Sequence, residues 1–339
     1  MTGVGIRCDA GPRTGVGHLV RCVALAEELT ARGVDVHFLS DLGGLAWAQR
    51  QLTDRGLPWH PAPYDPVGLV AAAERLGVDA VVLDSYLLDG GHGSAVRRSG
   101  RTVLAVVDGS LRGQVADVYV DQNLDAERDT PVLPVGTQRL AGLDYALLRQ
   151  AVRAHRPAAP RGRVSRTPKV VAFFGGTDAY RAAPVLARAL IATGAGFEAT
   201  VVAADASLRA ELLALVPAGG QRVTVLDPTD ELPKLLADAD LVISASGTST
   251  WELLCLGLPA ALVWVVDNQL LGYERTVARG LAAGLGHLAS LPSATAVSTL
   301  RGLLTDPDAR AELAARGWAA VDGLGVARVA DALLRRCRD

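Results

Sequence analysis

Residues 4–29, VGIRCDAGPRTGVGHLVRCVALAEEL, contain a strand, a glycine turn and a helix in direct succession. The apolar run VGIRCD predicts a buried strand. From Leu19 to Arg32, apolar residues recur at the three- and four-residue spacing of one helix face. A strand that passes through a glycine turn into a helix is the unit from which parallel α/β sheets are built.

The same alternation of apolar strands and amphipathic helices continues along the chain and predicts two doubly wound α/β domains. It is interrupted once, by RAHRPAAPRGRVSRTP at 153–168, which is rich in proline and arginine and has no apolar period. The predicted strands before this segment are 34–41, 78–86, 101–109 and 116–123. After it, 169–178 is a strand with a glycine turn, and further strands are predicted at 197–204, 221–228, 239–246 and 259–267.

The length of 339 residues also favours two domains, because single cores rarely grow past roughly 250–300 residues. We expect an N-terminal domain over 1–155, a linker over 156–168 and a C-terminal domain over 169–318. Residues 319–339 are expected to form a helix that returns to the first domain. Two such domains facing each other across a cleft form the GT-B architecture.

Composition and charge exclude several classes of function. With 34 Lys and Arg against 36 Asp and Glu, the net charge of −2 gives no reason to expect a nucleic acid or an anionic membrane as partner. No apolar run is long enough to span a bilayer, so stable membrane insertion is not expected. None of the four cysteines forms a C-x-x-C pair, which disfavours zinc and redox sites. The N-terminus enters a strand directly, and we expect a cytoplasmic protein without a signal peptide.

The glycine turn before the first helix places a histidine at the mouth of that helix. Gly15 and Gly17 allow positive φ or a close approach to a ligand. His18 should remain neutral near pH 7, because the positive end of the helix disfavours imidazolium, and a neutral imidazole can act as a general base. A nicotinamide-binding fingerprint is disfavoured because Val20 occupies the third glycine position. The alternative is a histidine that only caps the helix.

Two further turns follow strands in the C-terminal half. GGTD at 175–178 follows one strand, and SASGTSTWE at 244–252 follows another and opens a helix. Backbone N–H groups at such a helix start suit a diphosphate, and Glu252 could accept hydrogen bonds from ribose hydroxyls. Helix capping by Ser249 or Thr250 is the simpler alternative. The candidate nucleotide-binding residues are Gly175, Gly176, Ser246, Gly247, Thr248, Ser249, Thr250 and Glu252.

Five separated motifs resemble one known family. They are RCDAGPRTGVGHLVRCVALAEEL, LDSY, LAGLDYALLR, FFGGTD and SGTSTWELLCLGLPAALVWVVDNQ, in order from residue 6 to about residue 280. They resemble the UDP-sugar hydrolases of pseudaminic acid synthesis, the PseG family, and the spore-coat SpsG proteins. MurG-type glycosyltransferases are more distantly similar. The resemblance implies a GT-B fold, UDP held by the C-terminal domain, and neither metal nor cofactor.

The resemblance also implies roles for individual residues. His18 matches the histidine proposed to activate water at the anomeric carbon, and Tyr86 of DSY matches a tyrosine placed at the site, although a packing role is the alternative. Asp9 and Asp84 each end a predicted strand and could orient His18 or bind sugar hydroxyls. The catalytic candidates are His18, Tyr86 and Asp9, and the sugar-binding candidates are Gly15, Gly17, Asp84, Asn268 and Gln269.

These features predict a metal-independent UDP-sugar hydrolase that inverts the anomeric carbon. A glycosyltransferase is the main alternative, in which a small-molecule acceptor replaces water. A nucleotide-sugar binding protein without activity is the third. The sequence specifies neither the sugar, nor the preference for uracil, nor the oligomeric state.

Overall fold

The computed structural model describes residues 2–11, 15–162, 166–229 and 231–338. The chain divides into two compact α/β units, one formed by Met1–Gln150 with Gly323–Asp339 and the other by Ala151–Asp322. The second unit thus begins before the proline-rich segment, because Val152 packs in its core. The C-terminal segment from Gly323 onward is grouped with the first unit.

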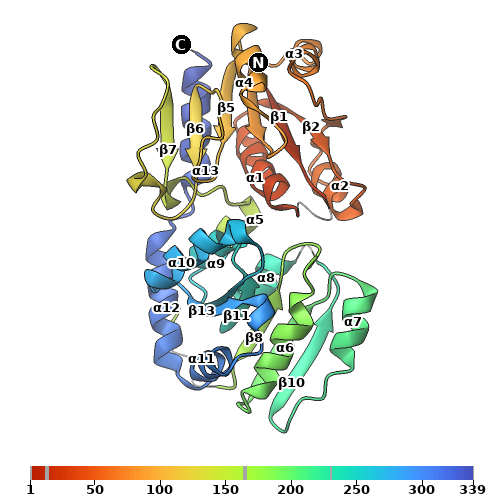
Figure 1. Ribbon diagram of the computed structural model, residues 1–339, viewed down its shortest axis with the longest axis vertical. Helices are drawn as coiled ribbons and strands as arrows, with labels where there is room; N and C mark the ends of the chain where they lie inside the picture. The colour runs from red at the N-terminus through yellow and green to blue at the C-terminus, as the bar shows by residue number, and fades with distance from the viewer. Residues whose placement is uncertain (1, 12–14, 163–165, 230, 339) are drawn as a thin grey trace. The chain divides into compact units, whose positions relative to one another are not determined.

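A seven-stranded sheet forms the centre of the first unit, and every strand pair in it is parallel (Figure 1). The strand order is β3-β2-β1-β4-β5-β6-β7, so the direction of winding reverses between β1 and β4. Ligands of doubly wound sheets bind at such a reversal, beside the carboxyl ends of the strands. The strands are β1 (Gly3–Asp9), β2 (Asp35–Asp41), β3 (Trp59–His60), β4 (Ala80–Asp84), β5 (Thr102–Val106), β6 (Val118–Asp121) and β7 (Gln138–Ala141).

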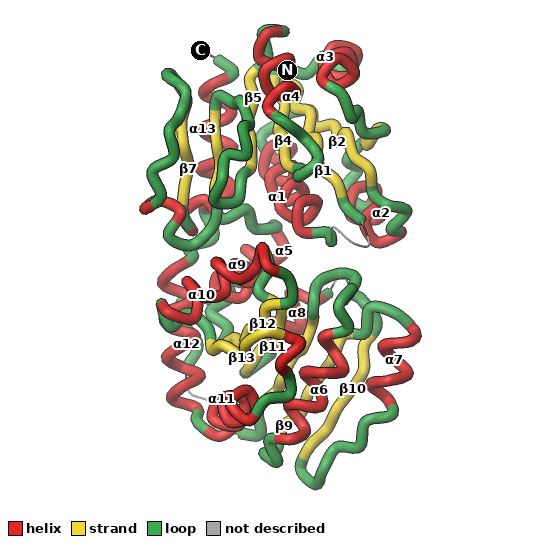
Figure 2. The backbone as a smooth tube through the Cα atoms, in the orientation of Figure 1, coloured by secondary structure: helices red, strands yellow, loops and turns green. Residues whose placement is uncertain are grey.

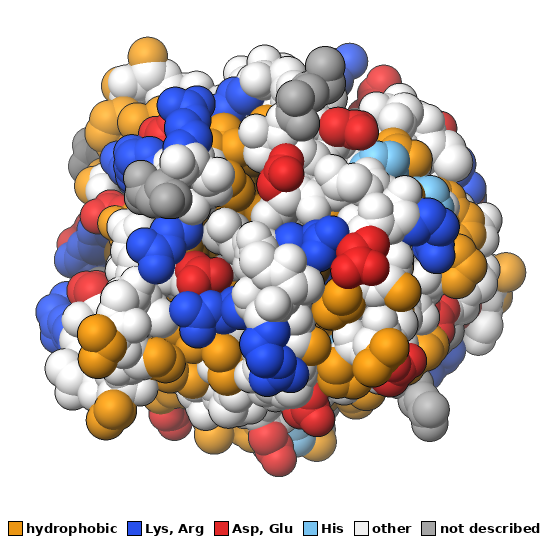
Figure 3. All heavy atoms as spheres, turned by 90° about the horizontal axis from the view of Figure 1, so that it is seen from above, with side chains coloured by type: hydrophobic (Ala, Val, Ile, Leu, Met, Phe, Trp, Pro, Cys, Tyr) orange, Lys and Arg blue, Asp and Glu red, His pale blue; other side chains and the backbone are white. Residues whose placement is uncertain are grey.

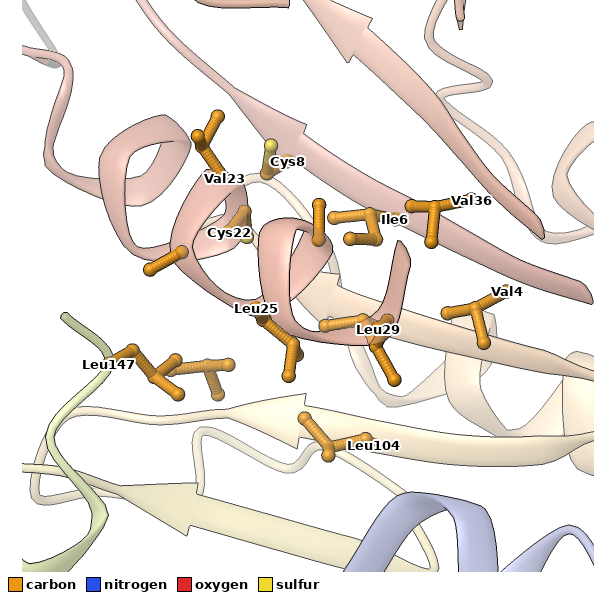
Figure 4. Close-up of a cluster of buried hydrophobic side chains, with 14 of the residues drawn as sticks. Val4, Ile6, Cys8, Cys22, Val23, Leu25, Leu29, Val36, Leu104 and Leu147 are labelled. Carbon is orange, nitrogen blue, oxygen red and sulfur yellow. The ribbon is translucent and has the colours of Figure 1, made fainter. Parts of the chain in front are cut away.

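Helices cover both faces of this sheet. Apolar side chains of α1, α2 and α13 pack against one face, and those of α3 and α4 pack against the other. Figure 4 shows Cys22, Leu25 and Leu29 of α1 beside Ile6 of β1. The helices of this unit are α1 (Gly17–Ala31), α2 (Ala46–Thr53), α3 (Pro66–Arg75), α4 (Gly90–Arg98), α13 (Gly325–Arg336) and the 3-10 turns η1 (Ala126–Arg128) and η2 (Leu143–Tyr145).

The C-terminal helix α13 belongs to the first unit for a clear steric reason. Gly325, its first residue, lies against the backbone of Tyr145 and Ala146, and a Cβ at this position would be 2.4 Å from the Ala146 nitrogen. Only glycine permits that approach. Val329 and Leu333 of α13 are fully buried in the same core as α1.

The second unit repeats the same architecture with a six-stranded parallel sheet. Its strand order is β10-β9-β8-β11-β12-β13, and the winding reverses between β8 and β11. Glycine-containing turns follow both of these strands. The strands are β8 (Lys169–Phe173), β9 (Phe197–Val202), β10 (Gln221–Leu226), β11 (Leu241–Ala245), β12 (Ala260–Trp264) and β13 (Ala283–His287).

Helices α6, α7 and α11 pack on one face of the second sheet, and α8 and α9 pack on the other (Figure 2). The short helix α5 (Gln150–Ala154) contributes Val152 to the second of these cores. The remaining elements are α6 (Ala182–Ala192), α7 (Ala206–Leu213), α8 (Leu232–Ala237), α9 (Ser249–Cys255), η3 (Asp267–Gln269), α10 (Leu270–Ala278), η4 (Leu288–Ser290), α11 (Ala294–Thr305) and α12 (Pro307–Ala320).

The face of the molecule that Figure 3 draws is mixed in charge. On the face drawn in Figure 3, basic and acidic side chains lie interspersed, in line with the net charge of −2. Within the parts of the chain that the structure describes, no helix combines the length and the apolar character needed to cross a membrane.

Candidate functional site

The turn between β1 and α1 places His18 at the winding reversal of the first sheet. Gly15 has a φ of +75°, as the sequence predicted for a glycine in this turn, and it exchanges two backbone hydrogen bonds with Gly11. Helix α1 begins at Gly17, so His18 is its second residue. The imidazole therefore lies beside the carboxyl ends of β1 and β4.

Asp84, the last residue of β4, orients the His18 ring. Its Oδ1 lies 2.6 Å from His18 Nδ1, and its side chain is fully buried. Burial opposes ionisation of Asp84, but Arg21 and His18 outweigh it and hold the pKa of this carboxyl well below its usual range. An ionised carboxylate can only accept, so Nδ1 carries the proton and Nε2 of a neutral ring presents its lone pair. This is the tautomer that a general base requires.

Arg21 connects this pair to a second carboxylate. It lies three residues after His18, on the same side of α1. Its Nε and Nη2 donate to the two oxygens of Asp84 at 2.7 and 2.6 Å, and its Nη1 donates to Asp108 Oδ1 at 2.9 Å. Burial disfavours the guanidinium charge, yet both aspartates raise the pKa of Arg21 above its usual value. Arg21 therefore remains charged and fixes Asp84 in place.

Tyr86 contacts His18 from the loop after β4. The two rings meet edge to face, with their centroids 4.7 Å apart and an interplanar angle of 89°. The Tyr86 hydroxyl donates to Asp108 Oδ2 at 2.7 Å. Burial and the neighbouring Asp108 raise the pKa of Tyr86, so the phenol stays protonated at neutral pH. The structure thus brings the two residues together, as expected for members of one site.

Asp9 has different partners from those of Asp84. It pairs with Arg7, accepts from the Ser85 hydroxyl at 2.7 Å and accepts from the Asp41 backbone N–H at 3.2 Å. Both aspartates were candidates for orienting His18, and of the two it is Asp84 that hydrogen-bonds to the ring. Asp9 instead supports the neighbouring Ser85, which precedes Tyr86.

In the second unit, the turn after β11 leads directly into α9. The helix begins at Ser249 with Thr248 in the cap position, and no side chain caps it. The alternative that Ser249 or Thr250 only caps the helix is therefore wrong, because both residues already lie inside it. The Thr250 hydroxyl is buried and has no hydrogen-bond partner among the described residues. Glu252 lies in the first turn, with 4 % of its surface exposed.

The sugar-binding candidate Gln269 lies beside this turn. A Cβ added to Gly247 would be 3.9 Å from Gln269 Nε2, so the two residues are neighbours. Gln269 Oε1 accepts from the Val265 backbone N–H at 3.0 Å. This bond uses the amide oxygen and leaves the two N–H donors of Nε2 to other interactions. Asn268 is exposed in the 3-10 turn η3. No side-chain cap is formed at the start of η3 or of α10, so neither residue serves as a helix cap there.

The turn after β8 contains a buried acid that the sequence did not single out as a site residue. Gly175 has a φ of +74°, and both Gly175 and Gly176 are exposed. Asp178 is buried and accepts from the backbone N–H groups of Ala182 and Ala183 at 2.8 and 3.0 Å. Burial raises its pKa to about 6. Asp178 therefore fixes the start of α6 next to the glycine turn.

Sequence reasoning missed four residues of the first site. Arg21 and Cys22 lie on the helix of His18, and Cys22 Sγ donates to Asp84 Oδ2 at 3.4 Å. Asp84 is the last residue of β4, and Asp108 follows the end of β5 in a similar position. An aspartate at the end of a predicted strand is a sequence signal that could have identified Asp108. No local pattern marks Arg112, whose guanidinium carbon lies 4.4 Å from the centroid of the Tyr86 ring.

Comparison with known proteins supports the resemblance seen in the sequence. No family model matches the chain. The spore coat polysaccharide biosynthesis protein SpsG of Bacillus subtilis (strain 168) is 24% identical over 348 residues, which cover 96% of both chains.

Solved structures share the whole fold. The crystal structure of Acinetobacter baumannii MurG has a TM-score of 0.73 at 18% identity and covers 99% of this chain and 100% of its own. A co-structure of S. aureus MnaA with UDP has a TM-score of 0.68 at 10% identity and covers 100% and 97% of the two chains. The chain therefore has the predicted GT-B fold, and in sequence it resembles SpsG over almost its entire length.

Proposed function

We propose that this chain is an enzyme that hydrolyses a UDP-sugar to UDP and the free sugar. The observation that carries the proposal is the 2.6 Å hydrogen bond between His18 Nδ1 and Asp84 Oδ1 at the winding reversal of the first sheet. A histidine oriented in this way by a buried, ionised carboxylate has the chemistry of a general base. A protein that only binds nucleotide sugars has no use for that arrangement.

In the proposed reaction, His18 Nε2 accepts a proton from water as the water oxygen bonds to the anomeric carbon. The bond between that carbon and the diphosphate oxygen breaks, and its electron pair leaves with UDP. Asp84 stabilises the imidazolium that forms, and Arg21 keeps Asp84 ionised and in position. Attack from the side opposite the leaving group inverts the anomeric carbon, as in one-step inverting glycosidases.

The second unit is proposed to bind UDP at its own winding reversal, between the turns after β8 and β11. Backbone N–H groups from Gly247 to Thr250 suit the diphosphate, whose charge grows as it leaves. The unsatisfied Thr250 hydroxyl supports this assignment, since a buried hydroxyl without a partner costs roughly 1–3 kcal/mol. Glu252 is proposed to accept from the ribose hydroxyls. The complex of MnaA with UDP supports the choice of nucleotide by analogy of fold.

Transfer to an acceptor is the second candidate reaction, and the likeness to MurG favours it. The chemistry is unchanged if an acceptor hydroxyl or amine replaces water, because His18 would remove its proton in the same way. The name of the relative SpsG, a spore coat polysaccharide biosynthesis protein, supports a role for either reaction in polysaccharide synthesis.

An assay of UDP release separates these alternatives. The protein is incubated with a panel of UDP-amino sugars, and UDP and the sugar are followed by chromatography and by NMR of the anomeric proton. The proposal predicts release of UDP in buffer alone, with the inverted anomer formed first. Release that requires an added alcohol or amine would establish transfer instead. Binding of UDP-sugars without turnover in either condition would contradict both reactions.

A further inference from the structure

One cation beside the first site stacks on an aromatic ring but makes no ion pair with any residue that the structure describes. Arg112 lies in the loop after β5, and its guanidinium carbon stacks 4.4 Å from the centroid of the Tyr86 ring. Its side chain makes no hydrogen bond or ion pair with any residue that the structure describes, and its Nε is buried without an acceptor. Stacking uses the face of the guanidinium and leaves the N–H donors in its plane unoccupied.

The backbone at this position is also strained. Arg112 has a φ of +49°, in the left-handed region that non-glycine residues rarely adopt. Such conformations are energetically unfavourable and concentrate at binding sites and active sites. The loop is held in part by a hydrogen bond from the Arg112 N–H to the Ser110 hydroxyl at 3.2 Å. The chain thus accepts both a strained backbone and an unpaired donor to place this guanidinium over Tyr86.

The neighbouring acidic side chains do not pair with the Arg112 guanidinium. Asp108, at the start of the same loop, is already engaged by Arg21 and by the Tyr86 hydroxyl. Asp84 is engaged by Arg21 and His18. A guanidinium with free in-plane donors matches a carboxylate or a phosphate in the bidentate geometry that arginine favours. The missing partner therefore has the chemistry of an oxyanion.

The free donors are close to the proposed base. The distances from the Tyr86 centroid to the His18 ring and to the Arg112 guanidinium are 4.7 and 4.4 Å, so Tyr86 separates the two groups by a single ring. We propose that Arg112 binds an oxyanion of the substrate beside His18 and thereby determines which UDP-sugars, or which acceptors, the site accepts. This inference rests on the proposed function for the identity of the substrate, but the anion site itself does not.

Two groups of the substrate could supply the oxyanion, namely the diphosphate and a carboxylate on the sugar. Binding measurements distinguish them. Titration calorimetry is performed on the wild type, Arg112→Gln and Arg112→Lys with UDP, with the pair UDP-glucose and UDP-glucuronate, and with inorganic pyrophosphate and free glucuronate. The two UDP-sugars differ only in the C6 carboxylate. Arg98 is an exposed arginine on α4, and Arg98→Gln serves as the control because it removes the same charge. Melting temperatures verify that each variant is folded.

A diphosphate source predicts that Arg112→Gln weakens UDP and pyrophosphate binding at least fivefold. A carboxylate source predicts unchanged UDP affinity and at least a fivefold loss of the preference for glucuronate over its neutral counterpart. In either case Arg112→Lys should recover only part of the loss, because lysine lacks the planar pair of donors. A purely structural role would alter stability without changing discrimination between charged and neutral ligands.

The inference is overturned if Arg112→Gln binds every ligand as the wild type and Arg98→Gln do. That result would leave the proposed function intact if the wild type still releases UDP. Conversely, Arg112-dependent binding of pyrophosphate or glucuronate by a protein that releases no UDP would retain the anion site and reject the hydrolase.

Discussion

Replacing Asp84 by asparagine removes the charge next to the proposed base and keeps the size of the side chain. The imidazolium formed during the reaction then loses a carboxylate whose oxygen lies 2.6 Å from its Nδ1. With about 4 Å between the centres of charge and an effective dielectric constant near 20, their interaction amounts to about 4 kcal/mol. Each 1.36 kcal/mol corresponds to a factor of ten in rate, so kcat should fall about 10³-fold.

The same substitution leaves the buried Arg21 with only one of its two carboxylates. Breaking a buried ion pair on one side costs about 3–5 kcal/mol, so the melting temperature of Asp84→Asn should also decrease. Rates must therefore be measured well below the melting transition. Single-turnover release of UDP at saturating substrate, together with a separate Kd for UDP, isolates the chemical step from substrate binding.

Asp89→Asn is the matched control. Asp89 also lies next to a histidine, with its Oδ1 2.8 Å from His92 Nδ1, but it caps α4 and its side chain is 80% exposed. Its substitution should leave kcat unchanged. The reasoning is refuted if folded Asp84→Asn retains kcat within tenfold of the wild type, since the carboxylate would then contribute little to the base.

Three other predictions follow from the structure. Tyr86→Phe keeps the ring against His18 but removes the hydroxyl that donates to Asp108, a hydrogen bond to a charged group worth about 1.5–3 kcal/mol. We expect kcat to fall about 10- to 100-fold while the affinity for UDP stays constant. Equal rates of the variant and the wild type would limit Tyr86 to a packing role. Glu252→Ala should raise the Kd for UDP about tenfold by calorimetry, and unaltered affinity would exclude the ribose contact. Asp178 has a pKa of about 6 in the folded protein against an ordinary value of 3.8. The native state thus holds an extra proton between about pH 4 and 6, stability should fall as pH rises through that window, and Asp178→Asn should remove this decline in urea unfolding.

Much of the fold could be predicted from local sequence signals. Long apolar strands followed by glycine turns and periodic helices appear where expected, as in β1 and α1, because burial and helix periodicity act over neighbouring residues. The short strands β3, β7 and β13 lacked such a signal. Two of the five residues of β13 are glycines, and its pairing with β12 depends on a sheet that local sequence does not reveal.

The site was only partly predictable for a related reason. His18 and Asp84 each lie within a recognisable motif, so their roles could be suggested separately. Their partnership with Arg21 and Asp108 depends on β1, β4 and β5 being neighbours in the sheet, which follows from the strand order. Arg112 was missed because stacking on Tyr86 and a left-handed backbone leave no pattern in sequence.

The extent of the two units likewise required three-dimensional information. The proline-rich composition suggested a linker over 156–168, whereas the units divide between Gln150 and Ala151 and between Asp322 and Gly323. Arg156, inside the expected linker, donates to the backbone carbonyls of Cys255 and Trp318 at 2.6 and 2.9 Å. Composition alone does not report hydrogen bonds of that kind.

The most direct measurement compares UDP release by the wild type and by His18→Ala at saturating UDP-sugar, alongside the affinity of each for UDP. If the imidazole removes the proton of the attacking nucleophile, kcat should fall about 10²- to 10⁴-fold while the Kd for UDP stays within twofold. A folded His18→Ala protein that releases UDP at the wild-type rate would show that His18 is not the base and would contradict the mechanism proposed for this chain.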